Sequence, residues 1–142
     1  MKFRSYAVLG ALFTVAFAGL TLPANAQNYK GTFTLPFEAH WGAVDLQPGN
    51  YTVSTAVVGS QPLISLTGNG KITSILPGPI DVREPSDRGS RLELTEVNGT
   101  LVVTKFVAAS LGKDYSFAIP KSISRNGFGA VALKKAVVPV SN

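Results

Sequence analysis

Hydrophobic and polar side chains alternate along most of the chain from residue 30 onward. In residues 32–41 an apolar side chain stands at every second position: Phe33, Leu35, Phe37, Ala39 and Trp41. A period of two is typical of a strand that buries one of its faces. Pro36 has no backbone N–H to donate, so it indicates a sheet edge or a bulge within this strand.

The same alternation predicts the remaining strands, and turn residues separate them. The strands are expected over residues 51–57, 62–67, 71–76, 91–97, 101–108, 115–119 and 130–140, with a short helix over residues 131–136 as the alternative for the last one. Asn98-Gly99 is the strongest hairpin signal, and Gly68-Asn69-Gly70 and residues 47–50 are typical of turns. The chain is therefore predicted to be all-β: an antiparallel β-sandwich or a small, partly open barrel of about seven or eight short strands.

Residues 77–90 lack this alternation and are predicted to form a long, proline-rich, charged loop. Long loops in compact domains are often functional. The loop's acidic side chains could offer oxygen ligands to a calcium ion: Asp81, Glu84 and Asp87. Because Arg83 and Arg88 lie among them, local ion pairing is the preferred interpretation. A shorter basic loop is expected over residues 121–129.

Residues 1–26 have the pattern of a cleaved secretory signal peptide. Lys2 and Arg4 precede a nearly uninterrupted apolar run over residues 6–22, and Ala24-Asn25-Ala26 offers a cleavage site before Gln27. An uncleaved membrane anchor is the alternative, since this apolar run approaches the length that crosses a bilayer. We expect an exported protein, periplasmic or extracellular, with a single β-rich domain over residues 27–142 and no membrane span after cleavage.

Composition narrows the chemistry that this domain can perform. The 142 residues include no cysteine and one histidine, so thiol catalysis, disulfides and a multi-histidine zinc site within one chain are excluded. The net charge of +5 falls to +3 without Lys2 and Arg4, which leaves 11 basic against 8 acidic residues. No dense stripe of Lys and Arg accompanies this charge, so nucleic acid is not an expected partner. No cofactor is expected.

His40 and Trp41, the chain's single histidine and single tryptophan, stand side by side near Glu38. Residues two apart on a strand share a face, so Glu38 and His40 are expected to project together and Trp41 to point into the core. The preferred interpretation is structural, with a polar pair on the solvent face. Trp41, His40 and Glu38 are nevertheless the first candidates for a ligand-binding site, because an exposed tryptophan would offer a binding platform.

Two further interpretations are weaker. A small hydrolase would need two carboxylates across a cleft, with Glu38 or Asp45 as the first candidates, but eight scattered acids give no way to choose the pair. No catalytic residue and no metal ligand is therefore assigned. An eight-stranded outer-membrane barrel would need strands of about ten residues with two aromatic belts, whereas most strands here are shorter and the aromatic residues cluster near the start.

The segment GTFTLPFEAHWGAVDLQPGNYTV, residues 31–53, resembles a group of small secreted bacterial β-rich proteins of unknown function. Their signature reads F-x-L-P-F-x-x-x-W-G followed by L-x-P-G-x-Y-T. The matching residues here are Phe33, Leu35, Pro36, Phe37, Trp41 and Gly42, then Leu46, Pro48, Gly49, Tyr51 and Thr52. The resemblance implies an exported bacterial β-domain, and it carries no activity with it.

Taken together, these features predict a non-enzymatic envelope or extracellular module that binds a partner such as a saccharide or a protein. The alternative is a structural protein that assembles with itself through strand edges.

Overall fold

The computed structural model describes residues 28–124 and 134–142, and these residues are mostly strand, as the alternation predicts. In chain order the strands are β1 (Lys30–Leu35), β2 (Ala39–Trp41), β3 (Val44–Leu46), β4 (Gly49–Val58), β5 (Gln61–Gly68), β6 (Lys71–Ile75), β7 (Ile80–Val82), β8 (Ser90–Val97), β9 (Thr100–Ala108), β10 (Lys113–Ser116) and β11 (Lys135–Val140). Two short helical turns complete the described part, η1 (Ala109–Leu111) and α1 (Lys121–Ser124). The strands outnumber the seven or eight expected because β2, β3 and β7 are short additions of three residues each.

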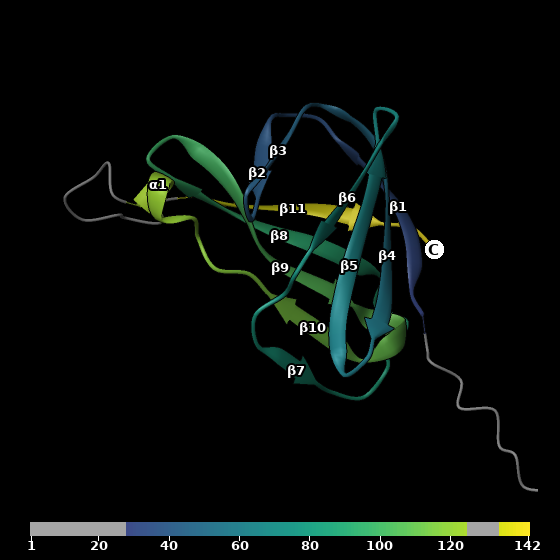
Figure 1. Cartoon of the computed structure of the whole chain (residues 1–142). Coiled ribbons are helices and arrows are strands. Elements are labelled where there is room, and N and C mark those ends of the chain that lie inside the picture. Colours follow the sequence, from purple (N-terminus) through teal and green to yellow (C-terminus); the bar gives the residue numbers. More distant parts are fainter. Residues whose placement is uncertain (1–27, 125–133) are drawn as a thin grey trace, which may run out of the picture.

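The strands form two separate sheets that pack face to face, with strands of one sheet crossing those of the other (Figure 1). The first sheet has the order β1-β4-β5-β6, and the second has the order β11-β8-β9-β10-β7, with the β2–β3 hairpin attached to β9. All pairs are antiparallel except β2 with β9. Neither sheet closes on itself, so the fold is the predicted all-β sandwich.

Two of the tight turns have the backbone that their sequence predicts. Asn69 and Gly70 connect β5 to β6 with φ values of 51° and 73°, and Asn98 and Gly99 connect β8 to β9 with 52° and 78°. Positive φ at both central residues is the geometry whose twist matches that of paired strands, and Asn-Gly tolerates it best. These two hairpins are therefore determined locally.

The core lies between the sheets and is rich in aromatic side chains. Trp41 is fully buried, with its ring centroid 5.3 Å from that of Phe117, 6.3 Å from that of Phe106 and 6.4 Å from that of Phe33. Phe33 belongs to the first sheet, whereas Trp41 and Phe106 belong to the second. The aromatic rings thus join the two sheets into one core, and buried aromatic area contributes strongly to the stability of such a core.

The prediction of a single strand over residues 32–41 is wrong in one respect. The segment divides into β1, in the first sheet, and β2, which pairs with β9 in the second. Pro36, Phe37 and Glu38 form the corner between the sheets, outside any strand. Pro36 cannot donate to a ladder, so the chain leaves the first sheet there, and the alternation continues because both strands face the same core.

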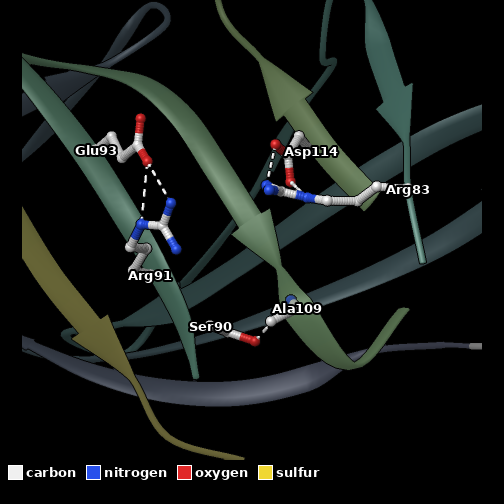
Figure 2. A network of polar contacts seen from close by, with 6 residues as sticks. All are labelled: Arg83, Ser90, Arg91, Glu93, Ala109 and Asp114. Atoms are coloured by element: carbon white, nitrogen blue, oxygen red, sulfur yellow. Dashed lines mark hydrogen bonds and ion pairs between the residues drawn. The ribbon is translucent and has the colours of Figure 1, made fainter. Parts of the chain in front are cut away.

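The predicted loop over residues 77–90 is largely tied to the second sheet. It contains β7, which pairs with β10, and the Arg83 and Ser86 amides donate to the Gly112 and Ala109 carbonyls at 2.7 Å and 2.9 Å. The prediction that Arg83 pairs with an acidic residue of its own loop is also wrong. Its guanidinium binds both carboxylate oxygens of Asp114 on β10, as Figure 2 shows.

Polar contacts cover the outer face of the second sheet beside this pair. Asp114 and Arg91 stand on either side of Val107 in register, and Arg91 also binds Glu93 at 2.9 Å (Figure 2). Val107 is 1% exposed although it points away from the core. The charged side chains therefore shield an apolar residue on this face, as long charged side chains commonly do.

The C-terminal strand β11 runs through Pro139 to Val140 at the edge of the second sheet, where a missing N–H is tolerated. Residues 135 and 136 of the alternative helix are in this strand, and residues 131–133 lie outside the described part, as do residues 1–26 and 125–129. No helix among the described residues is long and apolar enough to cross a membrane.

Candidate functional site

The three residues predicted as binding candidates occupy different environments. Trp41 is in the core, as its position on the apolar face predicts, and its surface offers no platform to a ligand. His40 points to the opposite side of β2, with 28% of its side chain exposed, and Glu38 is exposed in the corner before β2. The structure therefore separates the tryptophan from the two polar side chains.

Glu38 and His40 each pair with a residue on the other arm of the β2–β3 hairpin. His40 lies directly opposite Asp45 in register, and His40 Nδ1 is 2.5 Å from Asp45 Oδ1. Gln47 Nε2 donates to Glu38 Oε1 at 3.1 Å. The expected Glu38–His40 pair is replaced by two cross-hairpin pairs, because Gly42, with a φ of 60°, lets the chain turn back immediately after Trp41.

A surface cleft of about 580 Å³ opens between this hairpin and the first sheet, and we call it the hairpin cleft. Its lining consists of Ala43, Val44, Asp45, Leu46, Gln47, Tyr51, Leu66, Gly68, Asn69, Lys71 and Thr73. One wall comes from β3 and the residues on either side of it, and the other comes from β4, β5, β6 and the β5–β6 turn. The volume is within the range of about 300–1,000 Å³ that is common for small-molecule sites.

Tyr51 forms the floor of the cleft, where it is held from three sides. Its ring stacks on Phe33 with centroids 5.5 Å apart, and its hydroxyl donates to the Gln47 carbonyl at 2.6 Å. The Asn69 amide donates to the same hydroxyl at 3.3 Å. Opposite Tyr51 in register is Gly68, where an added Cβ would come within 2.1 Å of the tyrosine ring. Glycine is therefore required at this position for the ring to lie flat across β5.

Two opposite charges flank the cleft on different walls. Asp45, whose side chain is 66% exposed, stands at the rim on β3, and Lys71 begins β6 on the other side. Gln47, Asn69 and Thr73 add two amides and a hydroxyl to the lining. The lining therefore combines donors and acceptors with apolar surface from Val44, Leu46 and Leu66, an arrangement that can orient a polar ligand in water.

Reasoning from the sequence did not identify this cleft, since none of the three binding candidates, Trp41, His40 and Glu38, lines it. The sequence indicates Asp45 only as a hydrolase carboxylate, and Asn69 and Lys71 only as turn and strand residues. Asn69 and Lys71 lie two strands further along the chain, and they reach Asp45 only because β4 pairs with β5 and β5 pairs with β6. No spacing in the sequence signals such a juxtaposition.

The fold and this cleft define an all-β sandwich with a polar cleft under a short hairpin. Among the described residues, no group of three or more His, Asp or Glu side chains is placed to hold a metal ion. Comparisons with models of known protein families, with curated proteins and with solved structures found no match to this chain.

Proposed function

We propose that this protein is an exported, non-enzymatic binding module whose hairpin cleft holds a polar, hydroxyl-rich ligand such as a saccharide. The observation that carries the proposal is the convergence of Asp45, Gln47, Asn69, Lys71 and Thr73 around one cleft of suitable size. Amides, a carboxylate, an ammonium and a hydroxyl together supply both donors and acceptors, which hydroxyl groups require. The export part rests on the signal-peptide pattern of residues 1–26.

The geometry of the polar pairs favours binding over catalysis. His40 is directed to Asp45 on the exposed side of the hairpin, and Glu38 accepts a hydrogen bond from Gln47. A general base must be within hydrogen-bond reach of the group that it activates. Among the described residues, the hydrogen bonds of His40 and Glu38 go to Asp45 and Gln47 rather than to a serine or threonine nucleophile.

Titration of the folded domain, residues 27–142, with neutral tetrasaccharides tests the binding proposal. Amide resonances would be followed by NMR while cellotetraose, chitotetraose and maltotetraose are added. We expect at least one sugar to shift the amides of Asp45, Asn69 and Lys71, and the Asp45→Asn/Lys71→Gln variant to weaken binding several-fold. Lys135→Gln, an exposed change on β11, is the matched control. Shifts that avoid the cleft, or no shifts with any sugar, would contradict the proposal.

The export part has its own test. We expect a bacterial host that produces the full chain to release a protein beginning at Gln27, read by N-terminal sequencing and intact mass. A product that retains residues 1–26 in the membrane fraction would instead support the uncleaved anchor. Neither result depends on the cleft.

Self-assembly through a strand edge is the second candidate function, and one observation favours it. The edge strand β6 carries Ile72, which is 76% exposed, and Leu76 follows it at 67%. An exposed edge with apolar side chains is prone to pair with another chain. If the protein assembles in this way, its elution volume in sizing chromatography falls as concentration rises, and Ile72→Lys restores the monomer. A monomer at all concentrations would exclude this role for the β6 edge.

A further inference from the structure

A second groove lies at the end of the sandwich opposite the hairpin cleft, between the β4–β5 hairpin and the strands β7 and β10 (Figure 1). Its volume is about 250 Å³, just below the range of about 300–1,000 Å³ that is common for small-molecule sites. Its apolar lining consists of Ala56, Val57, Pro62, Ile80 and Val82, and Thr55 from β4 and Lys113 and Tyr115 from β10 complete it. We call it the open-end groove.

Strand register shows that these side chains belong to the inner faces of the two sheets. Val57 alternates with the inward-facing Val53 and pairs with Pro62. On the second sheet, Val82 stands opposite Lys113, and Ile80 stands opposite the buried Tyr115. Side chains on the inner faces of a sandwich normally bury one another. This end departs from that rule, because Val57 is 57% exposed and Val82 is 76% exposed.

Lys113 places one positive charge on this otherwise uncharged and largely apolar lining. The ion pairs among the described residues join His40 to Asp45, Arg83 to Asp114 and Arg91 to Glu93, and Lys113 takes part in none of them. The nearby acids Asp81 and Asp114 form a register pair that alternates to the outer face, where Asp114 binds Arg83. Of the charged side chains that β7 and β10 place near the groove, the Lys113 ammonium is thus the one on the inner face of the sheet.

We propose that the open-end groove binds a small anionic amphiphile, a single short acyl chain with a carboxylate head. The chain would cover the exposed inner faces of Val57 and Val82, and the carboxylate would bind the Lys113 ammonium. Apolar burial supplies most of the affinity and the charge pair selects an anionic head. This inference concerns a different site from the hairpin cleft and does not depend on the saccharide proposal.

Isothermal titration of the folded domain with octanoate tests this inference, with 1-octanol and octylammonium as matched neutral and cationic probes. We expect octanoate to bind at least three-fold more tightly than octanol, and octylammonium to bind most weakly. Lys113→Gln should remove the preference for octanoate over octanol. The pair Val57→Thr/Val82→Thr replaces one methyl group of each valine with a hydroxyl and should weaken binding of octanoate and octanol about five-fold, because less apolar surface is buried against the acyl chain. Both side chains are already exposed, so we expect the fold to be retained.

Lys135→Gln on β11 is the control for loss of a lysine elsewhere, and it should leave octanoate binding unchanged. Three outcomes overturn the proposal. One is absence of binding by any of the three probes, and another is octanoate binding that Lys113→Gln does not alter. The third is a concentration-dependent dimer that Val57→Thr/Val82→Thr dissociates, which would assign the groove to a second copy of the chain.

Discussion

At the scale of single residues, two buried side-chain polar atoms in the described part of the chain lack hydrogen-bond partners. They are the indole Nε1 of Trp41 and the hydroxyl of Tyr29. The Ser90 hydroxyl near Tyr29 accepts a bond from the Ala109 amide at 3.1 Å. An unpaired buried donor costs about 1–3 kcal/mol. Aromatic packing outweighs that cost here, because Trp41 contacts Phe33, Phe106 and Phe117 and Tyr29 lies edge-on to Phe106.

The burial of Trp41 gives the first prediction. Its emission should be blue-shifted and poorly quenched by acrylamide in the folded protein, because the indole is 0% exposed. Unfolding in urea should shift the emission to the red and make it readily quenched. Since this is the only tryptophan, the signal needs no variant to assign it. Ready quenching in a protein with intact far-UV circular dichroism would contradict this packing.

The buried tyrosines predict a loss of stability in alkali. Desolvation raises the pKa of both Tyr29 and Tyr115 above the ordinary value of 10.0. Well below pH 10 both phenols are protonated in the folded and in the unfolded state, so these two groups do not change the stability there. As the pH rises past 10, the tyrosines of the unfolded chain ionise first, and stability falls until the folded-state pKa is reached.

Urea unfolding followed between pH 8 and pH 11 measures this loss. The Tyr29→Phe/Tyr115→Phe variant should lose less stability over the same range, because its core has no phenol to ionise at these positions. At neutral pH, Tyr29→Phe alone should be neutral or slightly stabilising, since it removes a hydroxyl without a partner. An identical alkaline loss in the double variant would mean that other groups cause it.

At the scale of elements, the segment after β7 is held against the second sheet at Gly112. The Gly112 carbonyl accepts from the Arg83 amide, and an added Cβ at Gly112 would come within 2.1 Å of the Arg83 carbonyl oxygen. Gly112 also has a φ of 62°, a backbone conformation that residues other than glycine rarely adopt. The Arg83–Asp114 pair reinforces this attachment, and the Asp114 hydrogen bond raises the pKa of Arg83. Gly112 and the Arg83–Asp114 ion pair thus hold the charged segment that follows the edge strand β7 against the second sheet.

Gly112→Ala should therefore destabilise the protein more than a glycine substitution at an open turn. Gly99→Ala is the matched control, because Gly99 also has positive φ, at 78°, and nothing lies within 4 Å of an added Cβ. The control measures backbone strain alone, of about 1 kcal/mol. We expect Gly112→Ala to exceed it by at least about 1 kcal/mol in urea unfolding, because of the added clash, and to increase amide exchange at Arg83 and Ser86. An equal loss of stability in Gly112→Ala and Gly99→Ala would show that the segment after β7 is not held at Gly112.

At the scale of the whole molecule, the two sheets share one core. Phe33 of the first sheet stacks on Tyr51 and contacts Trp41 of the second, and Thr32 forms bridge hydrogen bonds with Ser141 after β11. The hairpin cleft and the open-end groove are lined by elements at opposite ends of the sandwich, the β2–β3 hairpin at one end and β7 at the other (Figure 1).

A shared core predicts a single unfolding transition. Far-UV circular dichroism reports both sheets, whereas Trp41 emission reports the contact between them, so their urea midpoints should coincide. Phe33→Ala should lower both midpoints together, by an amount equivalent to about 3–5 kcal/mol. Two separate midpoints, or a Phe33→Ala change confined to one signal, would show that the sheets unfold independently.

The sequence by itself determined the features that depend on neighbouring residues. Period-two alternation specifies the buried side of strands such as β1 and β4, and Asn69-Gly70 and Asn98-Gly99 specify two hairpins through their tolerance of positive φ. The burial of Trp41 follows from the same alternation. These predictions hold because the forces behind them act over a short stretch of chain.

Only the tertiary structure decided which sheet each strand joins and which side chains meet. Pro36 signals an interruption, yet the passage from the first sheet to the second depends on β2 finding β9, a strand in the C-terminal half of the chain. His40 faces Asp45 instead of Glu38, Arg83 binds Asp114 instead of the acids beside it, and Lys113 joins Val57 in one groove. Such contacts result from long-range strand pairing and packing, which a local pattern of polarity does not encode.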